Sequence, residues 1–407
     1  MLNNSPRVLM VVTRDIPVQA ESGRERTMSF IKGALAAGGE IDTLRLHSVL
    51  ERRSVGRILS VMGTALGGLL RGEPVPLQTL LFYSPGYLAA LTETVQRLQP
   101  QTVYFDGVRS GLYALPLRRR FPDLNLVCDF DDLMSRRIEV LAERRQPISM
   151  GYLKKLVPAW VQRHVLDGVV ARAIQAYEHR ALRSLEKRIS QVSDSVVLVS
   201  SVDAGHMREQ LPGVPVEVIP PYMEAQCQLK ELKGIRKFIF IGADSLLQNR
   251  LTIEYLVAAW QRLQPDTELH IFGKQSGTYP NVKGVIFRGF VKELSDAYEA
   301  GSILLAPSFV GGGVKTKVLE AFSYGVIPVG TETTFEGVQA DCRKLTLTEQ
   351  QLEDLIQHPQ RWLSVINSAG ALAVQGVVNN HAGRLLGERW RALVWPARAE
   401  KRVVNFN

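Results

Sequence analysis

The residues best suited to chemistry lie in one short run, PSFVGGGVKTKVLEAFSYGVIP, at residues 307–328. It contains three consecutive glycines, then two lysines and a glutamate: Gly311, Gly312, Gly313, Lys315, Lys317 and Glu320. Glycines at the start of a helix let backbone N–H groups approach an anion, and the helix dipole adds partial positive charge there. Two ammonium groups strengthen that field, so phosphate is the anion that fits best. A glutamate one to two turns into the helix can accept hydrogen bonds from the hydroxyls of a ribose.

The same run also has a purely structural interpretation. The glycines would then form a tight turn, the lysines would be solvated, and Glu320 would lie on the surface. Glycine loops are weak signals on their own. The run is not a P-loop, because that motif has a glycine directly before its lysine and Val314 occupies that place here.

The flanking elements predict where this loop lies. Residues 302–308 have the apolar character of a buried strand, and residues 314–325 have the spacing of a helix closed by Gly325. Ligands of open parallel sheets bind beyond the carboxyl ends of the strands. The glycine loop is therefore expected at the ligand-binding edge of a sheet.

Strand and helix patterns alternate along the whole chain. In the first half we expect strands at 7–12, 41–46, 102–106, 125–130 and 195–200, and helices at 27–39, 88–99, 112–121 and about 172–191. In the second half we expect further strands at 236–242, 268–273, 285–291 and 326–330, and further helices at 250–264 and 293–301. This alternation predicts an α/β fold with two Rossmann-like, doubly wound domains.

The domain boundary is expected at a pair of prolines. The linker Ile219–Ala225 divides the chain into an N-terminal domain at 1–218 and a C-terminal domain at 219–382. A tail helix within about 383–407 could pack back on the N-terminal domain or lie on the other.

Composition fits such a protein. The 407 residues are 45% hydrophobic and 22% charged, and they are too many for one typical core. Cys128, Cys227 and Cys342 are too scattered for a disulfide framework, so a reducing cytoplasm is expected. The apolar runs at 8–12 and 58–70 are too short for a signal-peptide core and for a membrane span, respectively.

The net charge of +9 has a focus, since residues 133–188 hold 12 basic and 5 acidic side chains. Such a segment suits anionic lipid, a pyrophosphate-linked acceptor or nucleic acid, or it is simply a solvated surface. Nucleic acid is not expected, because interleaved aromatics and a matching motif are missing from the sequence. The segments 148–170 and 58–70 have the composition of an interfacial membrane contact, although both could be core.

Several segments together resemble a known family. Residues 307–329 resemble the C-terminal signature of family 4-type GT-B glycosyltransferases, in particular the bacterial exopolysaccharide and lipid-linked glycan subgroup. Residues 240–256, 192–207 and 7–39 are similar to other segments of these enzymes. The resemblance covers most of the chain, and it is strongest at 235–338.

The resemblance implies a GT-B fold, in which two Rossmann-like domains face a cleft. It implies a nucleotide-diphosphate sugar on the C-terminal domain, an acceptor on the N-terminal domain, anomeric retention, and no metal or other cofactor. Lys317 and Glu320 would serve catalysis and ribose binding. The other donor-binding positions would be Gly23, Gly242, Asn249, Arg250, Phe290, Val291, Gly311, Gly312, Gly313, Val314 and Lys315.

The chain departs from the family pattern in three places. The family often has two glutamates in an E-x7-E pattern, and Gly312 occupies the first position here. The usual Gly-Arg and Lys after the first donor-domain strand are replaced by a segment with Asn249, which fits the subgroup, and with Arg250. The usual Asn-Gly of the linker is Pro221-Tyr222.

An acidic run at 128–135, CDFDDLMS, follows a predicted strand. Asp129 and Asp131 form a D-x-D pattern that suits a hard metal ion in other enzymes, but no metal is expected here. Asp132 is expected to orient the acceptor or to act as a general base, with Ser135 and Arg136 on the acceptor side. A helix N-cap is the alternative role for the aspartates.

These observations predict a glycosyltransferase (EC 2.4) of surface polysaccharide biosynthesis. Its partners would be a nucleotide-sugar donor and a glycan or polyprenyl-linked acceptor. It would be cytoplasmic and in peripheral contact with the inner membrane face. The alternatives are a sugar-nucleotide epimerase of similar architecture and a non-catalytic nucleotide-sugar-binding protein.

Overall fold

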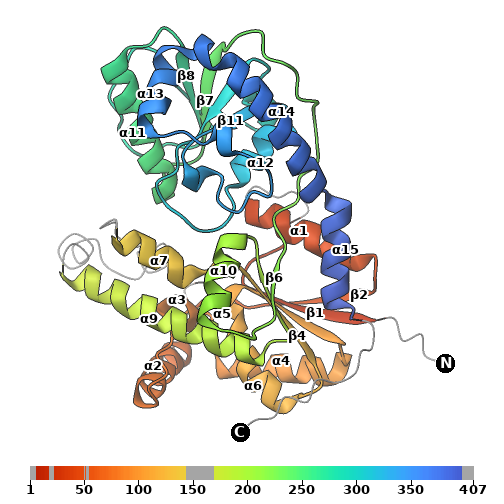
Figure 1. Ribbon diagram of the computed structural model, residues 1–407. Coiled ribbons are helices and arrows are strands. Elements are labelled where there is room, and N and C mark those ends of the chain that lie inside the picture. The colour runs from red at the N-terminus through yellow and green to blue at the C-terminus, as the bar shows by residue number, and fades with distance from the viewer. Residues whose placement is uncertain (1–5, 18–22, 50, 52–54, 144–168, 397–407) are drawn as a thin grey trace.

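The chain forms two α/β domains, one above the other in Figure 1. The computed structural model describes residues 6–17, 23–49, 51, 55–143 and 169–396. The N-terminal domain is built on a parallel sheet in the order β2-β1-β3-β4-β5-β6. Its strands are β1 (Arg7–Val12), β2 (Glu40–Arg45), β3 (Thr102–Asp106), β4 (Asn125–Asp131), β5 (Ser195–Leu198) and β6 (Val216–Val218).

Helices cover both faces of this sheet because successive residues of a buried strand point to opposite sides. Val8, Met10 and Val12 of β1 pack with helix α1 (Gly23–Ala36) and with the C-terminal helix α15 (Gly383–Val394). Leu9 and Val11 pack into the core on the other face. The remaining described helices of the domain are α2 (Val55–Leu70), α3 (Leu77–Leu80), α4 (Pro85–Leu98), α5 (Gly107–Gly111), α6 (Ala114–Arg120), α7 (Met134–Glu143), α9 (Val169–Val192) and α10 (Ser201–Gln210).

The C-terminal domain has a second parallel sheet, in the order β11-β10-β7-β8-β9. Its strands are β7 (Lys237–Ile241), β8 (Glu268–Phe272), β9 (Val285–Gly289), β10 (Ser302–Leu305) and β11 (Ile327–Val329). Its helices are α11 (Leu247–Leu263), α12 (Thr316–Ser323), α13 (Glu349–Gln357) and α14 (Leu363–Asn380). The predicted α/β fold with two doubly wound domains is confirmed.

One predicted helix is wrong. Residues 293–301 form only a short 3-10 turn, η2 (Leu294–Asp296). The chain turns instead toward the core, where Tyr298 is buried and its ring stacks on Tyr324 at 5.4 Å. Gly301, at φ +84°, then redirects the chain into β10. Tertiary packing of one tyrosine therefore overrides the helical spacing of the segment.

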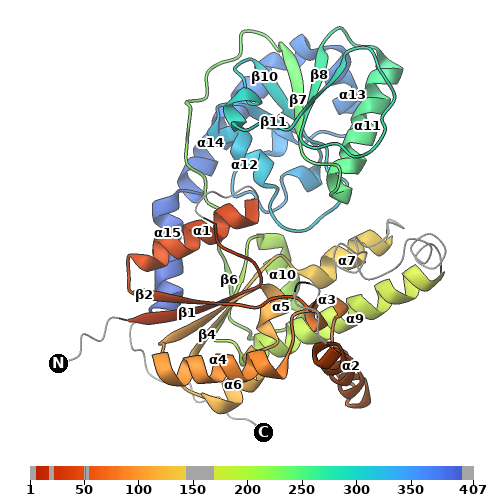
Figure 2. The same ribbon diagram turned by 180° about the vertical axis from the view of Figure 1, so that it is seen from behind.

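The chain passes between the domains in two places. After β6 an extended segment leads up to β7, and after α14 the chain returns so that α15 lies beside α1 (Figures 1 and 2). Trp390 packs edge-on against Tyr104 of β3, and the Thr102 hydroxyl donates a hydrogen bond to the Val394 carbonyl at 2.6 Å. Residues 397–407 of the predicted tail helix lie outside the described residues.

His381 joins the two connecting segments. It is fully buried, and its Nδ1 lies 2.8 Å from the carbonyl oxygen of Pro221. Its Nε2 accepts a hydrogen bond from the Gln339 N–H at 3.1 Å, so the neutral ring carries its proton on Nδ1. The Met223 N–H donates to the His381 carbonyl at 2.8 Å. One imidazole thus fixes both connections at the domain boundary.

None of the helices in the described ranges is long and apolar enough to cross a membrane. Of the predicted interfacial segments, residues 148–168 lie outside those ranges, whereas residues 58–70 lie in α2.

Acidification is expected to destabilise the native protein through His381. Burial lowers the pKa of His381 below its ordinary value of 6.5, so the unfolded chain binds this proton more readily. The stability that the neutral ring contributes is complete above about pH 6.5 and is lost as the pH falls below it. Urea titrations at pH 5.5 and 7.5 should show a smaller pH dependence for His381→Gln than for wild type. The exposed His206→Gln should behave like wild type, and equal pH dependence in all three proteins would contradict this role.

Candidate active site

The glycine loop between β10 and α12 holds carboxylates with its backbone. Gly312 and Gly313 have φ angles of +98° and +64°, in the left-handed region that favours glycine. The Gly312 N–H donates to Glu336 Oε2, and the Gly313 N–H donates to Asp203 Oδ2, both at 3.2 Å. Gly311 is buried beside Glu336. The loop therefore presents amides to negatively charged oxygens, and in this structure those oxygens belong to the protein itself.

The two carboxylates are joined by Arg136 of α7. Its Nη1 lies 2.7 Å from Asp203 Oδ1 and also pairs with Glu336. Because Arg136 and Asp203 belong to the N-terminal domain and Glu336 to the other, this group fastens the glycine loop across the domain boundary. We call Arg136, Asp203 and Glu336 the interdomain clasp. Arg136 was predicted to hold the acceptor, but its guanidinium is engaged in this clasp.

Of the two lysines of the run, Lys315 is buried and Lys317 is half-buried in the C-terminal domain. Lys315 is 9% exposed and donates to the Gly312 carbonyl at 3.0 Å. Lys317 donates to Asn249 Oδ1 at 2.7 Å, and its ammonium lies 4.1 Å from the centre of the Phe240 ring. Gly242 packs closely against Asn249. The structure thus brings together five of the predicted donor-side residues, from the end of β7, α11, the glycine loop and α12.

Burial weakens the hold of these lysines on their protons. It lowers the pKa of Lys315 to about 8 and, with a smaller contribution from neighbouring Lys315, the pKa of Lys317 to about 7. Among the described residues neither ammonium forms an ion pair with a carboxylate. A buried cation that lacks a counter-ion is strongly stabilised by a ligand that brings negative charge.

Binding of a nucleoside diphosphate should therefore take up protons. The anion stabilises the charged lysines, so affinity should rise as the pH falls from about 8 to about 6. Isothermal titration calorimetry with UDP near pH 7.5, in buffers of different ionisation enthalpy, should show that binding takes up protons. The number of protons taken up should be smaller for Lys317→Met than for wild type. Equal apparent enthalpies in all buffers for the wild type would contradict the prediction.

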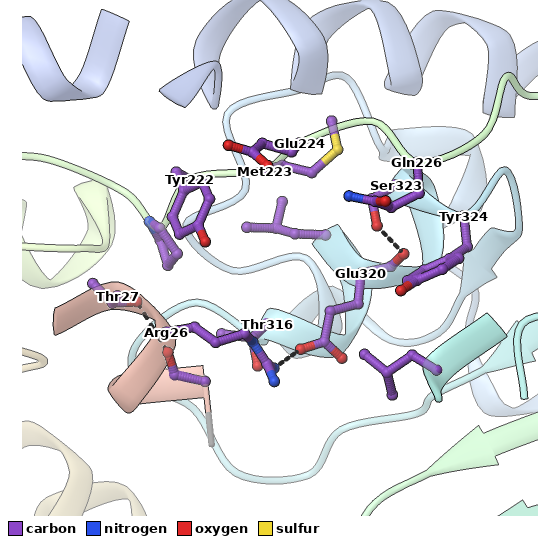
Figure 3. A pocket seen from close by; sticks show the side chains of 14 residues that line it. Arg26, Thr27, Tyr222, Met223, Glu224, Gln226, Thr316, Glu320, Ser323 and Tyr324 are labelled. Atoms are coloured by element: carbon purple, nitrogen blue, oxygen red, sulfur yellow. Dashed lines mark hydrogen bonds and ion pairs between the residues drawn. The ribbon is translucent and has the colours of Figure 1, made fainter. Parts of the chain in front are cut away.

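Glu320 faces a pocket that both domains and the linker share (Figure 3). We call it the linker-side pocket. Figure 3 shows Arg26 reaching from the start of α1 to pair with Glu320 on α12. The Tyr298 hydroxyl donates to the other carboxylate oxygen of Glu320 at 3.4 Å. The pocket is lined by Gly23, Arg26, Thr27, Pro221, Tyr222, Met223, Glu224, Gln226, Leu294, Thr316, Leu319, Glu320, Ser323 and Tyr324.

Gly23 lies at the domain contact, as its predicted role across the cleft requires. A methyl group at Gly23 would lie 2.9 Å from Thr316 Oγ1, at the first residue of α12. Arg26, one turn further along α1, was not predicted. The signal for it was the basic pattern GRER that follows the N-terminal loop, but the sequence does not reveal its partner.

The remaining predicted donor residues have mixed positions. Phe290 is 62% exposed, and the ammonium of Lys274 lies 5.4 Å from the centre of its ring. Val291 packs against the core of the domain, and Val314 packs beside Gly337. Arg250 does not join the lysines, because about half of its side chain is exposed and its nearest carboxylate is Glu254, at 3.9 Å. Its predicted donor contact is therefore not supported by the geometry.

A second pocket opens at the carboxyl ends of β1, β3 and β4 in the N-terminal domain. We call it the aspartate–arginine pocket, after its charged lining. Its residues are Thr13, Arg14, Arg24, Gln78, Asp106, Gly107, Val108, Arg109, Phe130, Asp131, Asp132, Met134 and Arg137. Ligands of open α/β sheets bind at this edge. The pocket is charged rather than apolar.

Arg24 neutralises the acidic run beneath this pocket. It lies 2.5 Å from Asp106 Oδ1, 3.0 Å from Asp129 Oδ2 and 3.2 Å from Asp131 Oδ1. Burial alone would lower the pKa of Arg24, but these carboxylates together raise it well above its ordinary value. Asp131 has a φ of +66°, which is uncommon for a residue other than glycine and is typical of functional sites.

Asp132 lies where the two sites meet. It is buried, pairs with Arg137 and lines the aspartate–arginine pocket. A methyl group at Gly313 would lie 3.5 Å from its Cβ, so the acceptor-side carboxylate adjoins the glycine loop.

Ser135, in contrast, is buried away from the pocket. Its N–H donates to Glu186 at 3.1 Å. The prediction that Ser135 contacts the acceptor is therefore wrong, since α7 turns this position toward α9.

Comparison with known proteins agrees with this geometry. Residues 235–364 match the family model for glycosyl transferases group 1. No curated protein matches the chain by sequence.

Among solved structures, the fold is similar to that of the sucrose-phosphate synthase of Thermosynechococcus elongatus, with a TM-score of 0.62 and 14% identity over 95% of this chain and 98% of that one. It is similar to Anabaena Alr3699/HepE in complex with UDP, with a TM-score of 0.60 and 10% identity over 94% and 98% of the chains. It is also similar to the lipopolysaccharide outer core galactosyltransferase WaaB, with a TM-score of 0.53 and 13% identity over 96% and 99%.

The two-domain fold is that of GT-B glycosyltransferases, and the family match at residues 235–364 supports a glycosyltransferase (EC 2.4). More narrowly, its C-terminal domain is a group 1 glycosyltransferase domain. The predicted fold and enzyme class are thereby confirmed, and the family 4-type subgroup stays a prediction.

Proposed function

We propose that this enzyme transfers a sugar from a nucleotide-diphosphate sugar to a glycan or lipid-linked acceptor in surface polysaccharide biosynthesis, with retention of configuration and without a metal. The observation that carries this proposal is the ammonium of buried Lys315 on the glycine loop, whose amides already bind carboxylates, with the half-buried Lys317 two residues further on. The UDP complex of HepE and the polysaccharide acceptor in the name of WaaB agree with this proposal.

The donor would lie along the glycine loop and the start of α12. Its diphosphate oxygens would replace the carboxylate oxygens of Glu336 and Asp203 at the amides of Gly312 and Gly313. Glu320 would accept hydrogen bonds from the ribose in the linker-side pocket. Charge on the leaving diphosphate grows in the transition state, so a lysine held beside it stabilises that state more than the bound substrate.

The acceptor would enter from the aspartate–arginine pocket. Its polar lining can both donate to and accept from sugar hydroxyls, and Asp132 adjoins the donor loop. Asp132 would orient the attacking hydroxyl by accepting its hydrogen bond. The arginines can also hold an anionic group, such as the phosphate of a lipid carrier. We place the enzyme in the cytoplasm, in peripheral contact with the inner membrane face.

Loss of the donor-binding groups should strongly impair turnover. Transfer of labelled sugar from a panel of UDP-, GDP- and ADP-sugars into acceptors from bacterial membranes is the assay. Glu320→Ala removes a charged acceptor and should raise the donor KM about 10- to 100-fold. Lys317→Ala should lower kcat about 100-fold. Glu231→Ala, at an exposed position between the linker and β7, is the control, and unchanged transfer in both test variants would refute the donor site.

Asp132→Asn should impair the use of the acceptor and leave binding of the donor unchanged. This substitution keeps the size of the side chain but weakens its hold on an acceptor hydroxyl, so kcat should fall about 100-fold. The thermal shift produced by the nucleotide sugar should stay at the wild-type value. Asp123→Asn, which alters an exposed aspartate of the same domain, should change neither quantity. A lost thermal shift with intact kcat would place Asp132 on the donor instead.

A further inference from the structure

Helix α2 carries an apolar stripe that faces away from the protein. Leu59 is 61% exposed, Met62 63%, Leu66 59% and Leu70 79%. Their spacing of three, four and four residues places them on one side of a helix of about 24 Å. The stripe thus holds four of the largest exposed apolar side chains among the described residues. Such a continuous patch marks an interaction surface, whereas single exposed apolar residues do not.

The opposite side of α2 is packed on the domain. Val61 and Ala65 lie against the core beneath the sheet, and Gly68 is buried beside Glu73 and Val75. The stripe is therefore not the core-facing side of a helix, and its exposure has to be explained by something outside the described fold.

Charge around α2 favours an anionic lipid surface as the occupant. The sequence from residue 52 to residue 72 contains Arg52, Arg53, Arg57 and Arg71 and no acidic residue. Arg71 is exposed at the end of the helix. The neighbouring helix α9 has exposed positions at Arg172, Arg180, Arg183 and Lys187, while its acidic residues Glu178 and Glu186 are buried. A second copy of this chain would bring the same positive charge to the contact, whereas anionic lipid would neutralise it.

The position of α2 links this surface to the acceptor side of the cleft. Helix α2 contacts α3, whose Gln78 lines the aspartate–arginine pocket and accepts a hydrogen bond from Arg109. Both views show α2 below α3 and α9 and farther from the C-terminal domain than α7 (Figures 1 and 2). A lipid-linked acceptor held in a membrane under α2 would thus approach the pocket from its own domain.

We propose that α2 docks on an anionic lipid surface, with its apolar stripe in the acyl–headgroup boundary and exposed basic side chains such as Arg71 among the headgroups. This proposal deepens the proposed function. Only its link to a lipid-linked acceptor rests on that function. The docking itself needs no turnover.

Vesicle flotation of the full chain tests this. Wild type should float with phosphatidylcholine vesicles that contain phosphatidylglycerol, and binding should weaken with added salt and in pure phosphatidylcholine. The triple variant Leu59→Gln, Met62→Gln, Leu66→Gln should bind at least about tenfold more weakly. Leu372→Gln, at a position 62% exposed on α14 of the other domain, is the matched control and should float like wild type.

Three results would overturn the docking. They are a wild type that does not float, a triple variant that floats as well as wild type, and light scattering that shows a dimer of the wild type which the triple variant loses. Arg71→Glu is a second, single substitution that should weaken binding to anionic vesicles alone. Nucleotide-sugar thermal shifts are measured on the same proteins, because intact donor binding without flotation refutes the docking, and flotation without donor binding refutes the donor site.

Discussion

The donor domain depends on one constraint: the ammonium groups of buried Lys315 and half-buried Lys317 form no ion pair with a carboxylate of the described residues. A cation inside a protein is stable only where fixed dipoles or a negative ligand replace its water. Here the Gly312 carbonyl, the Asn249 amide oxygen and the face of Phe240 supply those dipoles. The glycine loop, the start of α12 and the end of β7 have to meet at one edge of the sheet for this to occur. The positive potential of that edge follows from the fold.

The same edge explains how the two domains are held together. Amides of the glycine loop bind Glu336 and Asp203, Arg136 joins those carboxylates, and Arg26 pairs with Glu320. The amide contacts and the Arg26–Glu320 pair use groups that a nucleotide sugar would also use. Donor binding would therefore exchange contacts between the domains for contacts with substrate, and such an exchange couples binding to movement about the linker and His381.

Much of the architecture could be predicted because short stretches of sequence determine it. Strand β1 is a continuous apolar run, α12 is amphipathic between glycines, and both were expected at nearly their observed bounds. The helix predicted at 293–301 was wrong because burial of Tyr298, a long-range contact, decides the conformation of this segment. The roles of single charged residues could not be predicted for a similar reason. Arg136 carries no local mark that distinguishes a clasp from an acceptor contact, since its partners are 67 and 200 residues away along the chain.

The structure also places a carboxylate near the position where the first glutamate of the E-x7-E pattern is missing. Gly312 holds that position, but the Glu336 carboxylate from a later turn lies 3.2 Å from its nitrogen. A carboxylate is therefore present beside the loop although the linear pattern lacks it. Sequence comparison of one motif does not show this, because the replacement comes from a different element.

The most direct measurement is a crystal structure of the enzyme soaked with a nucleotide-diphosphate sugar that raises its melting temperature. We expect diphosphate oxygens within hydrogen-bonding distance of the Gly312 and Gly313 amides and of the Lys317 ammonium, with Glu336 and Asp203 displaced from those amides. A complex in which both carboxylates keep the amides and the diphosphate lies elsewhere would contradict it.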